Sequence, residues 1–347
     1  MANGPSEREL FDVTGPFHLL HVDWTEPNHK SSIAASLIRG VYILEQDRQQ
    51  KRVDQSALAP RWWEFFGFEL KETFKDNAGD ADSSIFGAIF MYQPHTLNED
   101  GDIQSQSRPP KYVIAFRGVI MEPDTRCQDL LISTKLLLNE LTQDPRYQTS
   151  LERVQEKIEQ VGAENVWLAG HSLGAAIALQ IGKTMAKQGL PIDSYLYNPP
   201  DLSYFSGTIT KPVVGMTVML SCIFFPVVIL GFSLLLLKNT ILNIHQSGSF
   251  MKLCEWKPSL FVNQNDPICR GYIEYFKLRK TMKKLGLCGI LITGGGRCDQ
   301  PHFIPTAQLV KNVNPEIVRF KLAHGIRQWW DPVLNLESVA YEFAISV

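Results

Sequence analysis

The chain has 347 residues, 20% of them charged, and a formal net charge of -2. A near-neutral chain has no overall field that attracts nucleic acid, so DNA and RNA are not expected as partners. The six cysteines form no C-x-x-C pair and no spacing typical of a metal site, which predicts free thiols in a reducing compartment. The N-terminal segment MANGPSERELFDVTGPF lacks the continuous apolar region of a secretory signal, so we expect no export and an intracellular location.

The first half of the chain shows one helical pattern and two strand patterns. Residues 31–52 have apolar side chains at helical spacing after polar capping residues and before a basic end, which predicts a helix. Residues 84–93 and 111–118 are short β-branched and aromatic runs, and the stretch between them is polar. They predict two strands joined by a solvated, hairpin-like connection.

Strand and helix patterns then alternate. Residues 129–141 and 151–162 predict helices, residues 165–170 a buried strand, and residues 174–189 a helix that Gly189 ends. Alternation of this kind predicts an α/β fold with a mostly parallel sheet covered by helices. We expect a single domain over residues 1–347, in which residues 1–83 form an N-terminal helical extension.

The strongest chemical signal lies at the joint between the predicted strand and the helix after it. The segment VWLAGHSLGAA contains G-x-S-x-G, with Gly170 and Gly174 on either side of Ser172. A serine in so sharp a turn needs neighbours without bulky side chains, which the two glycines provide. The start of the next helix places the N–H of Leu173 where it can donate to an oxyanion. Ser172 is therefore the predicted nucleophile.

The motif GHSLGAA, together with the earlier YVIAFRG, resembles the class 3 (fungal-type) lipase family of α/β hydrolases, and more closely its plant branch of intracellular lipase-like proteins. The resemblance extends over residues 84–330 and implies an α/β-hydrolase fold. It also implies that the second oxyanion donor is the residue after the R-G pair, which is Val119. Family members often have Ser or Thr there, so this chain lacks a supporting hydroxyl but keeps the backbone donor.

A serine nucleophile needs a carboxylate and a histidine, which follow it in that order in α/β hydrolases. Asp266 follows the apolar run 260–262 in SLFVNQNDPICRGY, and its N-D-P segment resembles the acid loop of the lipase family. An Asp that only caps the turn before Pro267 is the structural alternative. Asp201 in YLYNPPDLS is the second candidate for the acid.

Two histidines follow Asp266 and are candidates for the base. His324, in FKLAHGIRQWW, precedes a predicted helix and stands at a separation from Asp266 similar to that in the lipase family. His302, in a loop rich in Gly and Pro, is the alternative base. His171 lies inside the G-x-S-x-G motif, whose sharp strand-to-helix turn is called the nucleophile elbow, so we expect it to pack beside the nucleophile.

The run from Val213 to Leu237 contains no charged residue and is long enough for a membrane span. A single span would place Ser172 and Asp266 on opposite sides of the bilayer, where they could not form one site. Pro226 divides the run into two pieces too short to span as helices. We therefore expect a hydrophobic lid or membrane hairpin within an insertion over residues 208–245, with a buried pair of core helices as the alternative.

These observations predict a serine carboxylester hydrolase that cleaves lipid acyl esters at a membrane surface and needs no metal or organic cofactor. We expect residues 213–237 to contact the membrane. The protein would then lie at the cytoplasmic face of a membrane or in the cytoplasm. The basic run 277–284 could bind anionic lipid or be a solvated helix face. Two alternatives stay open: a non-catalytic ligand receptor or scaffold with the same fold, and a soluble esterase for small esters.

Overall fold

A computed structural model of the chain describes residues 11–76, 83–93, 108–120, 141–201, 248–284, 304–314, 317 and 319–343. Within these residues the strands are β1 (Phe68–Lys75), β2 (Ile85–Tyr92), β3 (Tyr112–Phe116), β4 (Val166–His171), β5 (Asp193–Tyr197), β6 (Ser259–Asn263), β7 (Ala307–Asn312) and β8 (Leu336–Tyr341). The α-helices are α1 (Phe11–Thr14), α2 (Pro27–Gln49), α3 (Arg61–Glu64), α5 (Pro145–Val161), α6 (Leu173–Gln188), α10 (Gly248–Glu255), α11 (Gly271–Lys284) and α13 (Phe320–His324). The 3-10 helices are η1 (Phe17–Leu19), η2 (Asp54–Ser56), η3 (Ala163–Asn165) and η4 (Ile326–Trp330).

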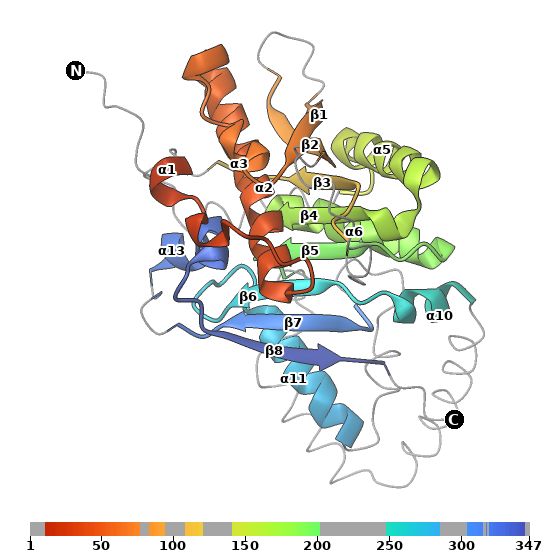
Figure 1. Cartoon of the computed structure of the whole chain (residues 1–347). Coiled ribbons are helices and arrows are strands. Elements are labelled where there is room, and N and C mark those ends of the chain that lie inside the picture. Colours follow the sequence, from red (N-terminus) through yellow and green to blue (C-terminus); the bar gives the residue numbers. More distant parts are fainter. Residues whose placement is uncertain are drawn as a thin grey trace, which may run out of the picture.

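The described strands form one sheet whose spatial order follows the chain from β1 to β8 (Figure 1). Neighbouring strands from β3 to β7 pair in parallel. At the edges, β1 pairs with β2, β2 with β3 and β7 with β8, all antiparallel. Parallel neighbours need crossover connections, and α6 makes one between β4 and β5. The predicted α/β-hydrolase fold, with a mostly parallel sheet covered by helices, is confirmed.

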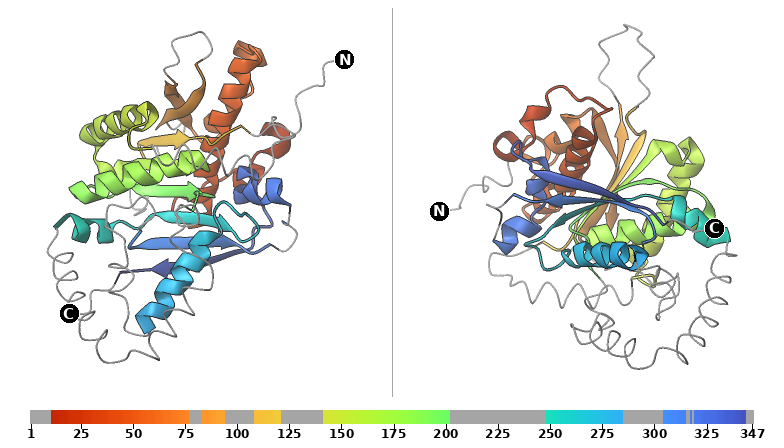
Figure 2. Two further views of the ribbon diagram at one scale, coloured as in Figure 1. Left: turned by 180° about the vertical axis from the view of Figure 1, so that it is seen from behind. Right: turned by 90° about the horizontal axis from the view of Figure 1, so that it is seen from below.

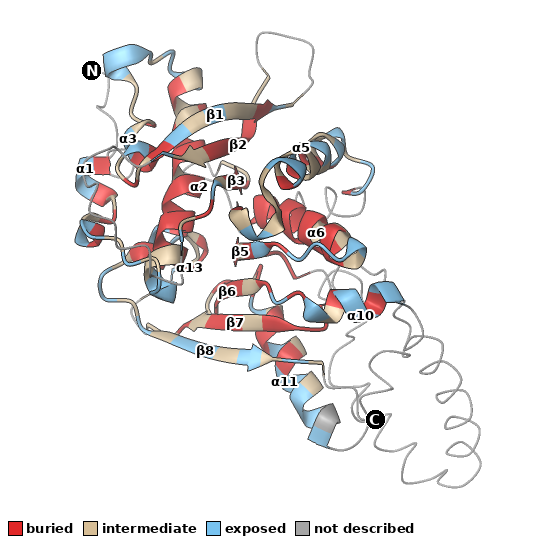
Figure 3. Ribbon diagram, turned by 45° about the vertical axis from the view of Figure 1, so that its right-hand side comes forward, coloured by how far each residue is buried: buried red, intermediate tan, exposed pale blue. Residues whose placement is uncertain are grey.

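Helices cover both faces of the sheet (Figure 2). α2 lies on one face with α1, α3 and η4, and α5, α6 and α11 lie on the other. The central strand β4 is buried along its whole length, with Val166 and Leu168 in one core and Trp167 and Ala169 in the other. This alternation is the period of two that a strand requires. Figure 3 shows α6 buried along most of its length, as expected for the helix that follows the central strand.

The N-terminal segment differs from the expectation of a helical extension over residues 1–83. Its described part also contains β1, which extends the sheet through its pairing with β2. The buried apolar residues Phe68 and Phe74 of this strand are separated by charged ones, which hid the strand pattern in the sequence. The predicted helix 31–52 is α2, which starts earlier at Pro27, a residue favoured in the first turn. The described helices of this segment pack on one face of the sheet, and β1 adds a strand at its edge.

The other strands and helices predicted within the described residues are present. The strands expected at 84–93, 111–118 and 165–170 are β2, β3 and β4, and the helices expected at 151–162 and 174–189 are α5 and α6. Gly189 ends α6 in the left-handed conformation, with φ at 88°. Four predicted features lie wholly or mostly outside the described residues: the insertion 208–245, the helix 129–141, the connection between the strands 84–93 and 111–118, and His302. Among the helices that are described, none has both the length and the apolar content to cross a membrane.

Candidate active site

Ser172 occupies the turn between β4 and α6, with φ of 54° and ψ of -124°. A non-glycine residue with positive φ is strained and is retained only where its surroundings hold it. The N–H of Ser172 donates to the main-chain oxygen of Tyr197, at 2.9 Å. A Cβ on Gly170 would lie 2.4 Å from the oxygen of Gly174, and a Cβ on Gly174 would lie 2.4 Å from that of Phe116. The two glycines therefore allow the tight packing around Ser172.

The structure brings the side chains of Ser172, His324 and Asp266 together, and all three are buried. Nε2 of His324 lies 3.0 Å from Oγ of Ser172, and Nδ1 of the same ring lies 2.9 Å from Oδ2 of Asp266. Ser172 follows β4, Asp266 follows β6, and His324 ends α13. Because β4 and β6 run parallel, the carboxyl ends of both strands lie at the same edge of the sheet.

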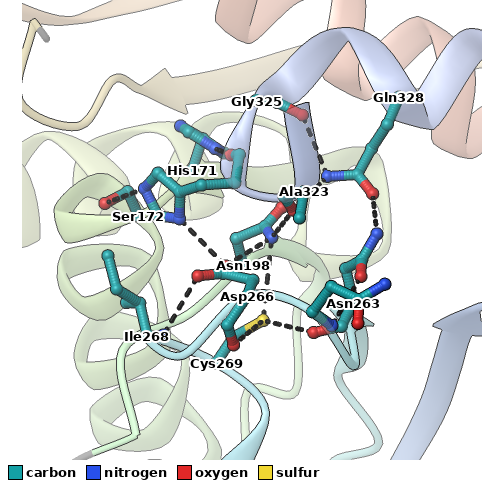
Figure 4. Close-up of polar contacts among 12 residues, drawn as sticks. His171, Ser172, Asn198, Asn263, Asp266, Ile268, Cys269, Ala323, Gly325 and Gln328 are labelled. Atoms are coloured by element: carbon teal, nitrogen blue, oxygen red, sulfur yellow. Dashed lines mark hydrogen bonds and ion pairs between the residues drawn. The ribbon is translucent and has the colours of Figure 1, made fainter. Parts of the chain in front are cut away.

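Asp266 is held ionised by its polar neighbours (Figure 4). The Asn198 amide donates to Oδ2 at 2.7 Å, and the Ile268 N–H donates to Oδ1 at 3.0 Å. Burial by itself would raise the pKa of Asp266, but His324, the Asn198 amide and the Ile268 N–H together lower it below its ordinary value. A carboxylate in this state can orient an imidazole and stabilise its protonated form.

A second group of amides holds the C-terminal end of α13, which carries His324, and the residue that follows it (Figure 4). The Gln328 amide donates to the main-chain oxygens of Ala323, at 2.6 Å, and Gly325, at 3.0 Å. Its oxygen accepts from Asn263 at 2.8 Å. Asn198 donates to the Ala323 oxygen as well, at 2.9 Å. Sequence reasoning missed these side chains, although Asn198, a polar residue directly after the strand β5, was a usable signal.

The two residues predicted as oxyanion donors, Val119 and Leu173, lie close to the nucleophile. A Cβ on Gly118 would lie 2.7 Å from Cβ of Ser172, so the loop that carries Val119 passes directly against the elbow. Within the described part of the chain, the N–H groups of Val119 and Leu173 donate no hydrogen bond. Both residues line a cavity of about 280 Å³, together with the apolar Phe86, Ile120 and Ile177, with Gly118, and with the polar or charged Gln49, Asp76, Arg117 and Arg146.

The other candidates from the sequence occupy different positions. Asp201 is buried after β5, and its N–H donates to the oxygen of Ile268 at 2.8 Å, whereas His324 contacts Asp266. His171 packs beside the elbow, as expected, with its ring 5.0 Å from that of His324. His302, the alternative base, lies outside the described residues.

The basic run 277–284 forms the second half of α11. Arg279 points inward and donates to the main-chain oxygens of Ile304 and Pro305, at 2.7 and 2.6 Å. Lys277 is exposed and pairs with Glu274 at 3.0 Å. Arg279 therefore anchors the helix, and only part of the run is a solvated face. Among the described residues, no group of three or more His, Cys, Asp or Glu side chains could hold a metal ion.

The chain matches no protein-family model. It is 34% identical, over 359 aligned residues, to a GDSL esterase/lipase of Arabidopsis thaliana, and the alignment covers 97% of this chain and 99% of that protein. This chain belongs to that esterase/lipase family. By family it is a hydrolase. It also shows a weak structural similarity to a lipase from Rhizopus microsporus var. chinensis, with a TM-score of 0.31, 12% identity and coverage of 70% of this chain and 67% of that one. The fold assignment rests on the sheet topology.

Proposed function

We propose that this esterase/lipase is a serine carboxylester hydrolase that cleaves lipid acyl esters. The observation that carries the proposal is the pair of contacts made by one imidazole, His324, with the hydroxyl of Ser172 at 3.0 Å and the carboxylate of Asp266 at 2.9 Å. A serine hydroxyl becomes a nucleophile when a neighbouring base removes its proton, and the carboxylate orients that base.

In the first half of the reaction, Oγ of Ser172 attacks the ester carbonyl carbon while its proton passes to Nε2 of His324. The carbonyl oxygen becomes negatively charged and accepts hydrogen bonds from the N–H groups of Leu173 and Val119. Asp266 stabilises the imidazolium. The carbon–oxygen bond to the alcohol then breaks, and the alcohol leaves with the proton from His324. In the second half, His324 takes a proton from water as the water oxygen attacks the carbonyl carbon of the acyl-serine. The bond from that carbon to Oγ of Ser172 then breaks, Oγ takes the proton back from His324, and a carboxylic acid leaves.

We also propose that the chain belongs to the class 3 (fungal-type) branch and its plant intracellular lipase-like group. The name of the Arabidopsis relative contains the letters GDSL, whereas the nucleophile segment of this chain reads Gly170, His171, Ser172, Leu173. The His in the elbow, the R-G pair before Val119 and the N-D-P segment at Asp266 support the class 3 assignment.

Two apolar features of the chain support a lipid acyl ester as the substrate. The cavity beside Val119 and Leu173 has apolar side chains in its lining that an acyl chain could contact, next to charged ones that a polar head group could contact. The charge-free run 213–237, outside the described residues, supports a membrane surface as the place of reaction, as an insertion over residues 208–245 of a single domain. An intracellular, cytoplasmic-face location is part of this proposal. A soluble esterase would need neither feature.

The test is labelling with a fluorophosphonate, which reacts only with activated serines, together with hydrolysis of a short soluble ester and of a dispersed long-chain ester. Wild type should label and hydrolyse both. Ser172→Ala should lose labelling and turnover while it stays folded. Ser194→Ala is the matched control, since Ser194 is also buried and its hydroxyl donates to a main-chain oxygen, that of Ile192 at 2.9 Å. An unlabelled, inactive wild type would indicate a non-catalytic receptor instead.

A further inference from the structure

The two peptide groups on either side of Gly118 are held by two side chains, one from the distant Tyr42 on α2 and one from the preceding residue, Arg117. The N–H of Gly118 donates to Oη of Tyr42 at 2.7 Å, and its C=O accepts from Nη1 of Arg117 at 2.7 Å. In a trans peptide the C=O and the following N–H point in opposite directions. The bond from Arg117 to the Gly118 oxygen therefore sets the direction of the Val119 N–H, the proposed oxyanion donor.

Arg117 can hold this loop because its own guanidinium is anchored. Its Nε donates to the oxygen of Ile85 at 2.6 Å, and its Nη2 donates to the hydroxyl of Ser84. Both anchors lie at the start of β2, the strand next to β3. The side chain thus ties the end of β3 back to the sheet and leaves Nη1 for Gly118.

Tyr42 supplies the second restraint, and it comes from α2. Its hydroxyl lies 2.8 Å from Nδ1 of His171, and Nε2 of His171 lies 2.7 Å from the main-chain oxygen of His324. A carbonyl oxygen only accepts, so Nε2 carries the proton and Nδ1 accepts from the Tyr42 hydroxyl. One directed chain of hydrogen bonds therefore runs from the Gly118 N–H through Tyr42 and His171 to the main chain of His324.

The protonation states of both side chains support a single arrangement of this chain. Burial raises the pKa of Tyr42 to about 12. Burial, reinforced by the neighbouring His324, lowers the pKa of His171 to about 3. Tyr42 therefore stays a phenol and His171 a neutral imidazole throughout the pH range in which an ester hydrolase is assayed.

We infer that Tyr42 is a positioning residue of the oxyanion hole. Its hydroxyl holds the Gly118 loop so that the Val119 N–H faces the oxygen of the tetrahedral intermediate, and His171 couples this loop to the main chain of His324. The inference rests on the proposed function. The hydroxyl contacts Gly118, which packs directly against the nucleophile, so α2 has a role in the site although it lies before residues 84–330, which resemble class 3 lipases.

The substitution Tyr42→Phe removes this hydroxyl and leaves the ring in place. Loss of an oxyanion donor costs roughly 100- to 1000-fold in kcat, and a misaligned donor should cost less, about 10- to 100-fold. The interaction forms with the transition state, so KM should stay within about twofold of wild type. Affinity for a trifluoromethyl ketone, which forms a tetrahedral adduct with serine, should fall by a factor similar to that in kcat.

The matched control is Tyr147→Phe. Tyr147 is also buried, and its hydroxyl lies 2.9 Å from that of Thr184, on the opposite face of the sheet from α2. Tyr147→Phe loses one hydroxyl contact and Tyr42→Phe loses two, so the midpoint of urea unfolding should fall in both variants and further in Tyr42→Phe. Only Tyr42→Phe should lose kcat and affinity for the ketone.

The experiment measures kcat and KM on a short soluble ester, the ketone inhibition constant and the urea midpoint for wild type and both variants. A loss of kcat and ketone affinity confined to Tyr42→Phe supports the inference. Three results would overturn it: wild-type kcat in Tyr42→Phe, an equal loss of kcat in Tyr147→Phe, or a loss of kcat with unchanged ketone affinity. An inactive wild type would contradict the proposed function instead, so the two failures are distinguishable.

Discussion

Asn198 and His324 share one carboxylate oxygen: the Asn198 amide lies 2.7 Å from Oδ2 of Asp266, and Nδ1 of His324 lies 2.9 Å from the same atom. Asn198 has φ of 48°, a conformation that asparagine tolerates better than most residues. The Trp329 indole donates to its side-chain oxygen at 2.7 Å, which orients the amide so that nitrogen faces the carboxylate. Asn198 is therefore a neutral donor placed where a charge would perturb the histidine–aspartate pair.

Replacing that donor with a carboxyl group should change the pH dependence of hydrolysis. In Asn198→Asp, two carboxyl groups would lie in contact, and the added negative charge would favour protonation of the histidine–aspartate pair. We expect the acidic limb of kcat/KM to move to higher pH by roughly one unit. Asn198→Ala, which adds no charge, is the control and should shift the limb less. A pH profile that is identical in wild type and Asn198→Asp would refute the predicted coupling.

The identity of the base is tested by two alanine substitutions. His324→Ala should lower kcat by roughly 10,000-fold or more, because the members of a triad act as a unit. His302→Ala should have a modest effect. Turnover of a short ester and the rate of fluorophosphonate labelling check both variants. A larger loss in His302→Ala would move the base to His302 and leave the enzyme class unchanged.

Val119→Thr should increase the rate. The side chain of Val119 has no hydroxyl to support the oxyanion, and threonine has nearly the same shape, so the substitution adds a donor without a change in volume. We expect kcat to rise by up to about tenfold, which corresponds to roughly 1.4 kcal/mol of transition-state stabilisation, with little change in KM. Val119→Ala, which adds no donor, is the control. Equal kcat in the threonine and alanine variants would contradict the expectation.

The buried His171 should make the fold less stable in acid. Its pKa is about 3 in the folded chain, below the ordinary value of 6.5, so the unfolded chain binds one more proton between these values. The free energy of unfolding should therefore fall as pH falls from about 6.5 toward 3, with this group contributing at most about 1.4 kcal/mol per pH unit.

His171→Gln removes that proton site and keeps an amide that can donate and accept. Urea unfolding gives the free energy of unfolding of wild type and of His171→Gln at pH 7.0, 6.0 and 5.0. Subtracting one value from the other at each pH cancels the contributions of the other titrating groups. Wild type should lose more stability than the variant over this range. Parallel losses would show that His171 is protonated to the same extent in the folded and unfolded chains.

Deletion of residues 213–237, with a short polar linker in their place, tests the membrane proposal. The deletion should move the protein from the membrane fraction to the soluble fraction, since an inserted apolar segment contributes more to binding than a basic patch. If the segment also covers the site, turnover of a soluble ester should persist while turnover of aggregated lipid falls. An insoluble, inactive product would indicate that the run belongs to the core.

Local sequence was sufficient for the features that depend on local chemistry. The elbow at Ser172 could be predicted because its glycines, its strand and its helix are contiguous in the chain. The parallel part of the sheet could be predicted from the alternation of strands and helices. β1 could not, because its charged residues mask a strand that is stabilised by pairing with β2. The roles assigned to Ser172, Asp266 and His324 stay predictions until the variants are measured.

Only the tertiary structure decided which distant side chains meet around Ser172. Tyr42 and His171 are 129 positions apart, and Asn198 and Ala323 are 125 apart. No periodicity or short motif marks such contacts, because they arise when α2 and the loop at His324 pack against the same end of the sheet. Sequence alone therefore determined the elbow and the alternating α/β pattern, whereas long-range packing determined how the oxyanion loop and the loop of His324 are held.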